Sequence, residues 1–300
     1  MADHTPKKYP SLRFFITVTI MIIVGLVLVL SVGFYYIKTS SILRKTSRDS
    51  IVRELNQVND TIQNQIETID SIIPLFMSNE VIQNALENPG AGINYPFSVE
   101  RQMSYIYNSS ALSEKNFTDS IYIYNSRSTV YHAYTSGILE NVDDTSEFLQ
   151  STIDSANPHL MCYTSPLHDQ NMYFARNLYS SNSGNRIGMI VININAQKWI
   201  EYCSKTIDPS WFIMLFNKEF SLSSDSDFSK DQLLDLYSSL TAQKNSVLFK
   251  EQSFGGRDYF MASQSLERLG LTSAVAAPKD LLLENLNSTL KSYLLVTLAV

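Results

Sequence analysis

An α+β fold with a membrane anchor is the class that the sequence predicts. Three observations predict it: an uncharged run of 24 residues near the N-terminus, a helical period in the apolar residues that follow, and two successive groups of β-rich runs. The 300 residues include only 17% charged residues, against about 25% in typical soluble domains, which indicates a long apolar segment. The net charge of -6 disfavours a nucleic-acid partner, which would need a basic face.

The uncharged run covers residues 14–37. About 20 residues cross the hydrocarbon core of a bilayer, so the run predicts a transmembrane helix. A cleaved signal peptide is the alternative, but its apolar region is usually about 7–15 residues long and ends in small residues, whereas this run closes on Phe34, Tyr35 and Tyr36. Basic residues flank both ends, so their balance does not set the orientation. A short tail, residues 1–13, before a large domain favours the tail inside the cell and the domain outside.

A long amphipathic helix is predicted over residues 38–76. Its apolar residues recur at an average spacing close to the 3.6 residues of a helical turn. They are Ile51, Leu55, Val58, Ile62, Ile66, Ile69, Ile73 and Phe76. Pro74 is expected to end or kink this helix, because proline lacks the N–H that a helix interior needs.

The middle of the chain predicts two consecutive antiparallel α+β units, residues 77–206 and 207–278. In the first, short helices are expected over 78–86 and 99–112, strands over 119–125, 129–134, 172–179 and 187–194, and a closing helix over 196–202. In the second, strands are expected over 211–216, 247–250, 258–264 and 271–277, with a helix over 230–240 and a turn at Gly255 and Gly256.

The C-terminal segment begins with an exit helix, residues 279–290, after Pro278, which suits a helix start. The apolar run in residues 291–300 is too short to cross a bilayer. It is either a core segment or the start of a second, truncated transmembrane helix, and the second interpretation is favoured.

The sequence contains no phosphate-binding glycine loop, metalloprotease helix or nucleophile elbow. The four histidines are scattered, and the acidic loop at Asp225 departs from a calcium loop at Lys230 and Leu236. We therefore expect no catalytic residue, no metal site and no cofactor within the chain. Cys162 and Cys203 either form one disulfide or are two buried thiols.

Tyrosine is the residue type that points to a binding site, with 17 in the chain and several on the first predicted sheet. Phenols and a guanidinium hold a small polar or anionic ligand by stacking and bidentate hydrogen bonds. The candidate ligand-binding residues, expected to face one pocket, are Tyr122, Tyr124, Tyr131, Tyr173 and Arg176. The alternative is purely structural, because tyrosine also has a high β-propensity.

The order of these parts resembles a double Cache sensor and, more narrowly, the front of YesM-type membrane sensor histidine kinases of Gram-positive bacteria. The matching runs are SIYIYN at 120–125, YFARNLY at 173–179, IGMIVININ at 187–195, FGGRDYF at 254–260 and LTSAVAAP at 271–278. The resemblance implies two PAS-like sheets between transmembrane helices, with residues 77–206 as the membrane-distal unit and 207–278 as the membrane-proximal unit. The Arg-x-Trp-Tyr run of amino-acid-binding relatives is absent, so the ligand is left open.

The resemblance also implies a location and partners. The chain would be an extracytoplasmic sensor in a bacterial cell membrane that contacts the lipid bilayer, forms a homodimer and binds an unknown small molecule or extracytoplasmic protein. A kinase region after residue 300 would bring ATP and a response regulator. A chemoreceptor, a diguanylate cyclase, a membrane-bound AraC-type regulator and a structural membrane protein without a ligand stay open as alternatives.

Overall fold

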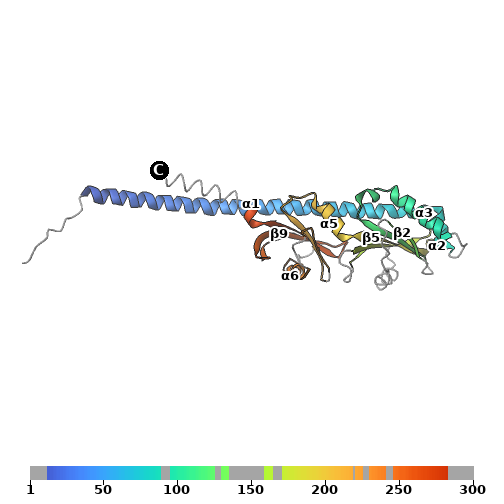
Figure 1. Cartoon of the computed structure of the whole chain (residues 1–300). Coiled ribbons are helices and arrows are strands. Elements are labelled where there is room, and N and C mark those ends of the chain that lie inside the picture. The colour runs from blue at the N-terminus through green and yellow to red at the C-terminus, as the bar shows by residue number, and fades with distance from the viewer. Residues whose placement is uncertain are drawn as a thin grey trace, which may run out of the picture. The chain divides into compact units, whose positions relative to one another are not determined.

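The computed structural model describes residues 12–88, 95–125, 130–134, 159–164, 171–218, 220–225, 230–240 and 246–282. The chain divides into two compact units. One contains Met1–Asp49 and Lys279–Val300, and the other is Ser50–Pro278, which holds both sheets (Figure 1). The tail over 1–11, the exit helix beyond residue 282 and the apolar run over 291–300 lie outside the described residues.

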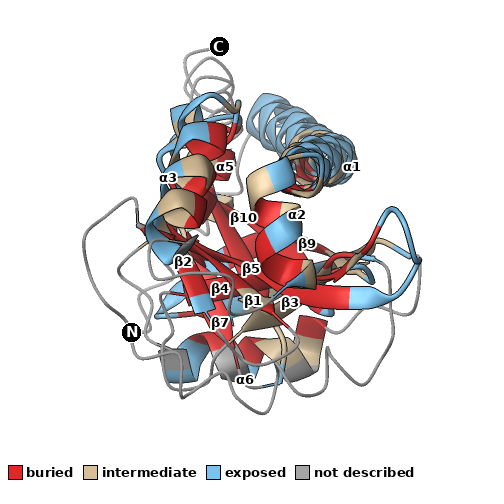
Figure 2. Ribbon diagram, turned by 90° about the vertical axis from the view of Figure 1, so that its right-hand side faces the viewer, coloured by how far each residue is buried: buried red, intermediate tan, exposed pale blue. Residues whose placement is uncertain are grey.

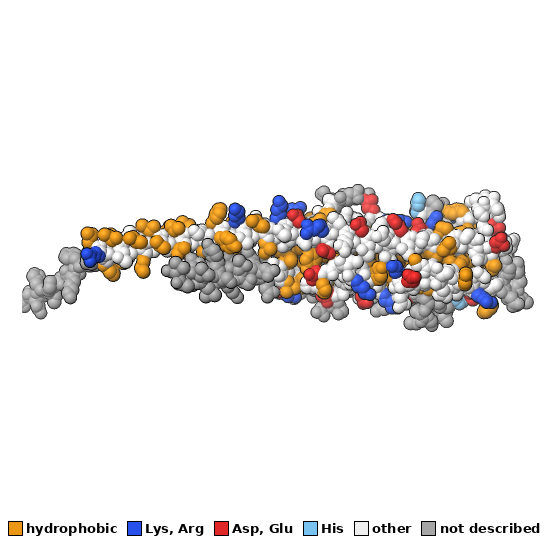
Figure 3. Space-filling view, turned by 90° about the horizontal axis from the view of Figure 1, so that it is seen from above, with side chains coloured by type: hydrophobic (Ala, Val, Ile, Leu, Met, Phe, Trp, Pro, Cys, Tyr) orange, Lys and Arg blue, Asp and Glu red, His pale blue; other side chains and the backbone are white. Residues whose placement is uncertain are grey.

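Helix α1, Leu12–Met77, contains both the predicted transmembrane segment and the predicted amphipathic helix. Its N-terminal part is long and apolar enough to cross a membrane, by length and composition, and Figure 3 shows hydrophobic side chains along it. Pro74 does not end the helix at once, because the chain completes one more turn in which the amide of Ser78 donates to the Pro74 carbonyl oxygen at 2.9 Å.

The apolar stripe of α1 lies in the core of the second unit, as its period predicts. All eight stripe residues, Ile51, Leu55, Val58, Ile62, Ile66, Ile69, Ile73 and Phe76, are at most 2% exposed. Burying aliphatic side chains of this size stabilises the fold by about 1.5–3 kcal/mol each. The stripe therefore attaches α1 to the two sheets described next.

The first sheet, called the N-terminal sheet, has the strand order β2-β1-β5-β4-β3 with every neighbouring pair antiparallel. Its strands are β1 (Thr118–Asn125), β2 (Val130–Tyr134), β3 (Met161–Thr164), β4 (Asn171–Tyr179) and β5 (Arg186–Asn195). The accompanying helices are α2 (Glu80–Glu87), α3 (Tyr95–Asn108), the short 3-10 helix η1 (Ser113–Lys115) and α5 (Ala196–Ser204).

The second sheet, called the C-terminal sheet, repeats the same topology in the order β7-β6-β10-β9-β8. Its elements are β6 (Phe212–Phe216), β7 (Ser221–Ser223), α6 (Lys230–Leu240), β8 (Leu248–Phe254), β9 (Arg257–Leu266) and β10 (Leu271–Pro278). Gly255 and Gly256 have φ angles of 58° and 78° and form the predicted turn between β8 and β9, since glycine adopts positive φ without steric cost.

The two faces of each sheet are covered differently. In Figure 1, α1 lies along one side of both sheets, whereas α6 lies on the opposite side of the C-terminal sheet. Figure 2 shows the buried residues gathered in the two sheets and on the helix surfaces turned toward them. We call the side toward α1 the inner face and the other side the outer face.

The structure corrects some predicted boundaries. Helix α3 begins at Tyr95 and ends at Asn108, four residues earlier at each end than the sequence predicts. Strands β3 and β7 were not predicted, because they are only four and three residues long and a run that short carries too few alternations to show a period. The remaining predicted strands are present within a few residues.

Candidate functional site

The outer face of the N-terminal sheet carries a cluster of tyrosines. Successive residues of a strand point to opposite faces, and Tyr122 and Tyr124 of β1 lie opposite Val191 and Met189 of β5. In the same way, Tyr163 of β3 lies opposite Tyr173 of β4. The outer-face cluster is therefore formed by Tyr122, Tyr124, Tyr163, Tyr173, Ala175, Met189 and Val191.

The tyrosines of this cluster form two pairs. The ring centroids of Tyr122 and Tyr124 are 6.5 Å apart at an interplanar angle of 36°, and those of Tyr163 and Tyr173 are 6.4 Å apart at 37°. The strand order places β5 and its Val191 between β1 and β4. Because neighbouring strands are about 4.8 Å apart, the two pairs stand about 10 Å from each other across the sheet.

Polar side chains share this face with the tyrosines. Asn193 lies opposite both Ser120 and Tyr173, and Asn177 lies opposite Met189. Asn193, Asn177 and Ser120 are 1%, 2% and 2% exposed. Amide and hydroxyl groups are costly to bury without hydrogen-bond partners. This face therefore needs hydrogen-bond partners for its polar groups, which a purely apolar packing surface does not.

The C-terminal sheet provides that comparison within the same chain. Its outer face is covered by α6, whose Leu233, Leu236 and Leu240 pack on an apolar cluster. The strand residues of that cluster are Phe212, Met214, Phe216, Phe254, Tyr259, Met261, Ala274 and Ala276. The same face is thus an apolar core under α6 in one sheet and a buried layer of aromatic and amide side chains in the other. The second kind of surface suits a small ligand.

The structure splits the five sequence-predicted site residues between the two faces. Tyr122, Tyr124 and Tyr173 share the outer face. Tyr131 lies opposite Ile123 and is 4% exposed, so it belongs to the inner face. Arg176 is also on the inner face, because three positions separate it from Tyr173 and sheet side chains alternate with period two. The expectation that all five face one pocket is wrong.

Three outer-face residues with aromatic or amide side chains were missed by the sequence prediction. Tyr163 lies on β3, which is too short to recognise from its pattern. Asn177 and Asn193 lie in strands that the sequence predicts. Asn177 is four positions after Tyr173 in β4, and Asn193 of β5 lies opposite Tyr173, so both share its face. The even spacing within β4 could have identified Asn177, because every second residue of a strand points to the same face.

Arg176 forms an ion pair with α1. Its Nη1 atom donates to Oδ1 of Asp70 at 2.8 Å, and the other carboxylate oxygen of Asp70 accepts from Nη2 of Arg268 at 3.3 Å. Arg268 lies in the turn between β9 and β10. One carboxylate on α1 therefore connects the N-terminal sheet to a turn of the C-terminal sheet.

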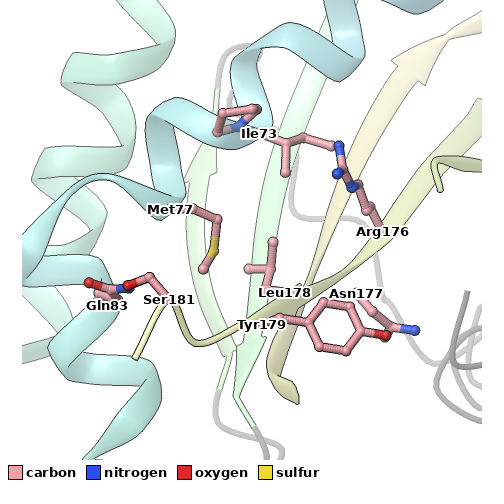
Figure 4. Close-up of a pocket in the computed structure, with 9 residues that line it drawn as sticks. Ile73, Met77, Gln83, Arg176, Asn177, Leu178, Tyr179 and Ser181 are labelled. Carbon is pink, nitrogen blue, oxygen red and sulfur yellow. The ribbon is translucent and has the colours of Figure 1, made fainter. Parts of the chain in front are cut away.

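A cavity of about 280 Å³ opens beside Arg176 on the inner face. It lies between the end of α1, helix α2 and the end of β4, and Figure 4 shows Met77 and Leu178 pointing toward one another across it. Its lining residues are Ile73, Pro74, Met77, Gln83, Arg176, Asn177, Leu178, Tyr179 and Ser181.

A second cavity, of about 510 Å³, lies between strand β3 and the β9–β10 turn, with His159, Cys162 and Arg268 in its wall. Burial raises the pKa of the Cys162 thiol far above its usual range, which disfavours the reactive thiolate.

Both cysteines, Cys162 and Cys203, are free thiols. Within the described residues no group of three His, Cys, Asp or Glu side chains is placed to hold a metal ion.

The comparisons with known proteins identify the fold. No family model and no curated protein matches the sequence. Among solved structures, the sensory domain of the Campylobacter jejuni chemoreceptor Tlp3 with isoleucine bound superposes with a TM-score of 0.53 and 13% identity, covering 81% of this chain and 96% of that one. The sensor domain of the V. cholerae histidine kinase DctB gives a TM-score of 0.52 and 15% identity, covering 77% of this chain and 96% of that one.

These likenesses define a class of fold. Both neighbours are sensory domains, one from a chemoreceptor and one from a histidine kinase. The long helix followed by two antiparallel five-stranded sheets is the double Cache fold, as the sequence resemblance predicts. At 13–15% identity the likeness concerns the fold alone.

Proposed function

We propose that this chain is the extracytoplasmic ligand-sensing part of a bacterial membrane receptor. The N-terminal part of α1 would be the membrane anchor, with the N-terminal tail inside the cell and both sheets outside. The outer face of the N-terminal sheet would bind a small polar molecule. The observation that carries this proposal is the contrast between the two outer faces, one filled by α6 and the other lined by tyrosines and buried asparagines.

The outer-face cluster suits a ligand with one flat or apolar face and several hydrogen-bonding groups. The rings of Tyr122 and Tyr173 offer stacking surfaces, and the amides of Asn177 and Asn193 offer both donors and acceptors. The neighbouring Tlp3 structure holds isoleucine, so amino acids are one class to test here, beside neutral polar molecules such as monosaccharides.

Signal transmission would use the side chains of β4, which alternate between the two faces of the sheet. Ala175 and Asn177 point to the outer face, and Arg176 between them points to the inner face, where it pairs with Asp70 of α1. A ligand that shifts β4 would therefore act on α1, which is one helix from Leu12 to Met77. A ligand changes the state of such a receptor only through different affinities for its two conformations.

For the output, we propose a YesM-type sensor histidine kinase, with a kinase region after residue 300 that binds ATP and phosphorylates a response regulator, and with a homodimer formed through α1. This rests on the sequence resemblance. The histidine kinase DctB and the chemoreceptor Tlp3 share the fold, so the fold does not choose between these outputs. A phospho-accepting histidine and an ATP-binding region in the coding sequence after residue 300 would support the kinase.

Thermal unfolding of the full chain in detergent tests ligand sensing. The probes are the 20 standard L-amino acids and a set of common monosaccharides, because a ligand that binds only the folded state raises the melting temperature. We expect at least one probe to stabilise the chain, and expect Tyr173→Ala to abolish that shift.

The matched control is Tyr237→Ala. Tyr237 packs against the apolar cluster under α6 on the outer face of the C-terminal sheet, so this variant also loses a tyrosine on an outer face. It should keep the ligand-induced shift even if its own melting temperature falls. An equal loss of the shift in both variants would place the ligand elsewhere, and an absence of any stabilising probe would favour the structural membrane protein.

A further inference from the structure

The inner-face cavity beside Arg176 combines an apolar wall with polar ends. Ile73 and Met77 of α1 and Leu178 of β4 supply aliphatic and thioether surface. At one end, Nε2 of Gln83 donates to Oγ of Ser181 at 2.6 Å, which fixes both side chains. At the other end lies the guanidinium of Arg176 (Figure 4). The volume of about 280 Å³ suits a molecule smaller than most drugs.

The charges around Arg176 do not balance. Arg176 and Arg268 share the single carboxylate of Asp70, which leaves this group of three with one excess positive charge. Among the described residues that line the cavity, Arg176 alone is charged. Its ion pair with Asp70 uses Nη1, and a guanidinium has five N–H donors in a planar fork. The remaining donors can bind a second carboxylate.

We propose that this cavity binds a small monocarboxylate with a compact apolar body. The carboxylate would accept hydrogen bonds from Arg176, and the body would lie against Ile73, Met77 and Leu178. A zwitterionic amino acid fits less well, since its ammonium group would meet no anion in the described wall. Among the outer-face residues named above, only Asn177 also lines this cavity, so the proposed site goes beyond the sensing role proposed above.

A carboxylate bound in the cavity would also neutralise the excess positive charge of Asp70, Arg176 and Arg268. Two guanidiniums and two carboxylates would then join α1, β4 and the β9–β10 turn. Bidentate carboxylate–guanidinium pairs fix orientation as well as adding energy. The carboxylate would therefore tighten the connection between the two sheets through α1.

The test uses the full chain in detergent, with isovalerate as the probe and isovaleramide as its neutral match. Binding is followed by ligand-observed NMR titration. For a ligand with seven non-hydrogen atoms we expect a Kd on the order of 1 mM. Arg176→Gln should weaken isovalerate binding at least about tenfold, because a charged hydrogen-bond donor is lost. Met77→Trp, which fills the cavity at a half-buried position, should weaken it to a similar extent.

Two control variants test whether isovalerate binds in this cavity. Arg53→Gln removes an exposed arginine of α1 that neither lines the cavity nor pairs with Asp70, and should change the Kd by less than about threefold. Tyr173→Ala alters the outer-face cluster and should leave isovalerate binding unchanged. Equal binding of isovaleramide, normal binding in both Arg176→Gln and Met77→Trp, or no saturable binding of isovalerate would each overturn the proposal.

Discussion

Asn59 of α1 accepts a hydrogen bond from the hydroxyl of Ser273 of β10 at 2.6 Å. The amide of the same Asn59 donates to Oε1 of Gln264 of β9 at 2.8 Å. Asp70, about three helical turns further along α1, pairs with Arg176 of the N-terminal sheet. Positions separated by about three full turns lie on the same side of a helix. One side of α1 therefore carries a polar contact to each sheet.

Substituting Asn59 by alanine should destabilise the Ser50–Pro278 unit by about 1–3 kcal/mol, because it leaves polar partners without their hydrogen bonds. Ser273 is fully buried, so water does not replace the lost acceptor, and its hydroxyl keeps only the longer contact with the Gln264 carbonyl oxygen at 3.3 Å. Urea unfolding followed by circular dichroism measures the change. Asn56→Ala is the matched control, since Asn56 is exposed on the same helix and its loss should cost less than about 0.5 kcal/mol.

Asp70→Asn should lower the free energy of unfolding by about 1 kcal/mol at low salt, since it removes the charge shared by two arginines. The value is modest because Asp70, Arg176 and Arg268 have side chains that are 30–39% exposed. At about 1 M NaCl the difference from wild type should shrink, because salt screens exposed charges.

The two arginines should differ in their contributions. Arg176 lies 2.8 Å from Asp70 and Arg268 lies 3.3 Å away, so Arg176→Gln should destabilise the chain more than Arg268→Gln at low salt. The same unfolding assay compares them. A larger effect of Arg268→Gln, or a salt-independent effect of Asp70→Asn, would contradict the ion-pair interpretation.

Much of the fold could be predicted from local patterns. The stripe from Ile51 to Phe76 repeats over seven helical steps, and long periodic segments are the most reliable signal in a sequence. Strand β5 was predicted because its nearly continuous apolar run suits the middle of a sheet, and it lies between β1 and β4. These patterns depend on each residue's own neighbours and need no knowledge of tertiary contacts.

The site was harder to predict because it depends on register. Composition alone groups Tyr131 with Tyr122, yet the hairpin pairs Tyr131 with Ile123. A shift of one residue in register moves a side chain to the other face. Arg176 could have been assigned correctly from its odd spacing to Tyr173, but its partner Asp70 is 106 positions away in the chain. No local pattern indicates a contact of that separation.

Gly188 allows β5 to approach β1 closely. A methyl group at this position would overlap the backbone carbonyl oxygen of Tyr124 and press on Leu86. Gly188→Ala should therefore destabilise the unit by about 2–3 kcal/mol, because a backbone atom cannot move as a side chain can. Gly256→Ala is the comparison, since nothing lies within 4 Å of its added methyl group and only its φ of +78° opposes alanine. That variant should cost about 1 kcal/mol, and equal effects would contradict the close approach.

The stability of the chain should fall at alkaline pH through Cys203. Burial raises the pKa of the Cys203 thiol to about 12, whereas a thiol in an unfolded chain titrates near pH 8.5. Between these values the unfolded state releases a proton that the folded state retains, so the free energy of unfolding decreases as pH rises. Below about pH 8 both states keep the proton, and the thiol adds no pH dependence.

Cys203→Ala isolates this effect. Between about pH 7.5 and 9.5 the wild type should lose about 1 kcal/mol more stability than the variant, measured by urea unfolding at each pH. Cys162, whose pKa is also raised by burial, stays in both proteins and cancels in the comparison. In a Cys162→Ala background and the same pH range, Cys203 of the native chain should react with a thiol reagent only after denaturant is added, because it is buried and the thiolate is the reactive form. Parallel stability losses in the two proteins would show that Cys203 titrates in the folded state as it does in the unfolded one.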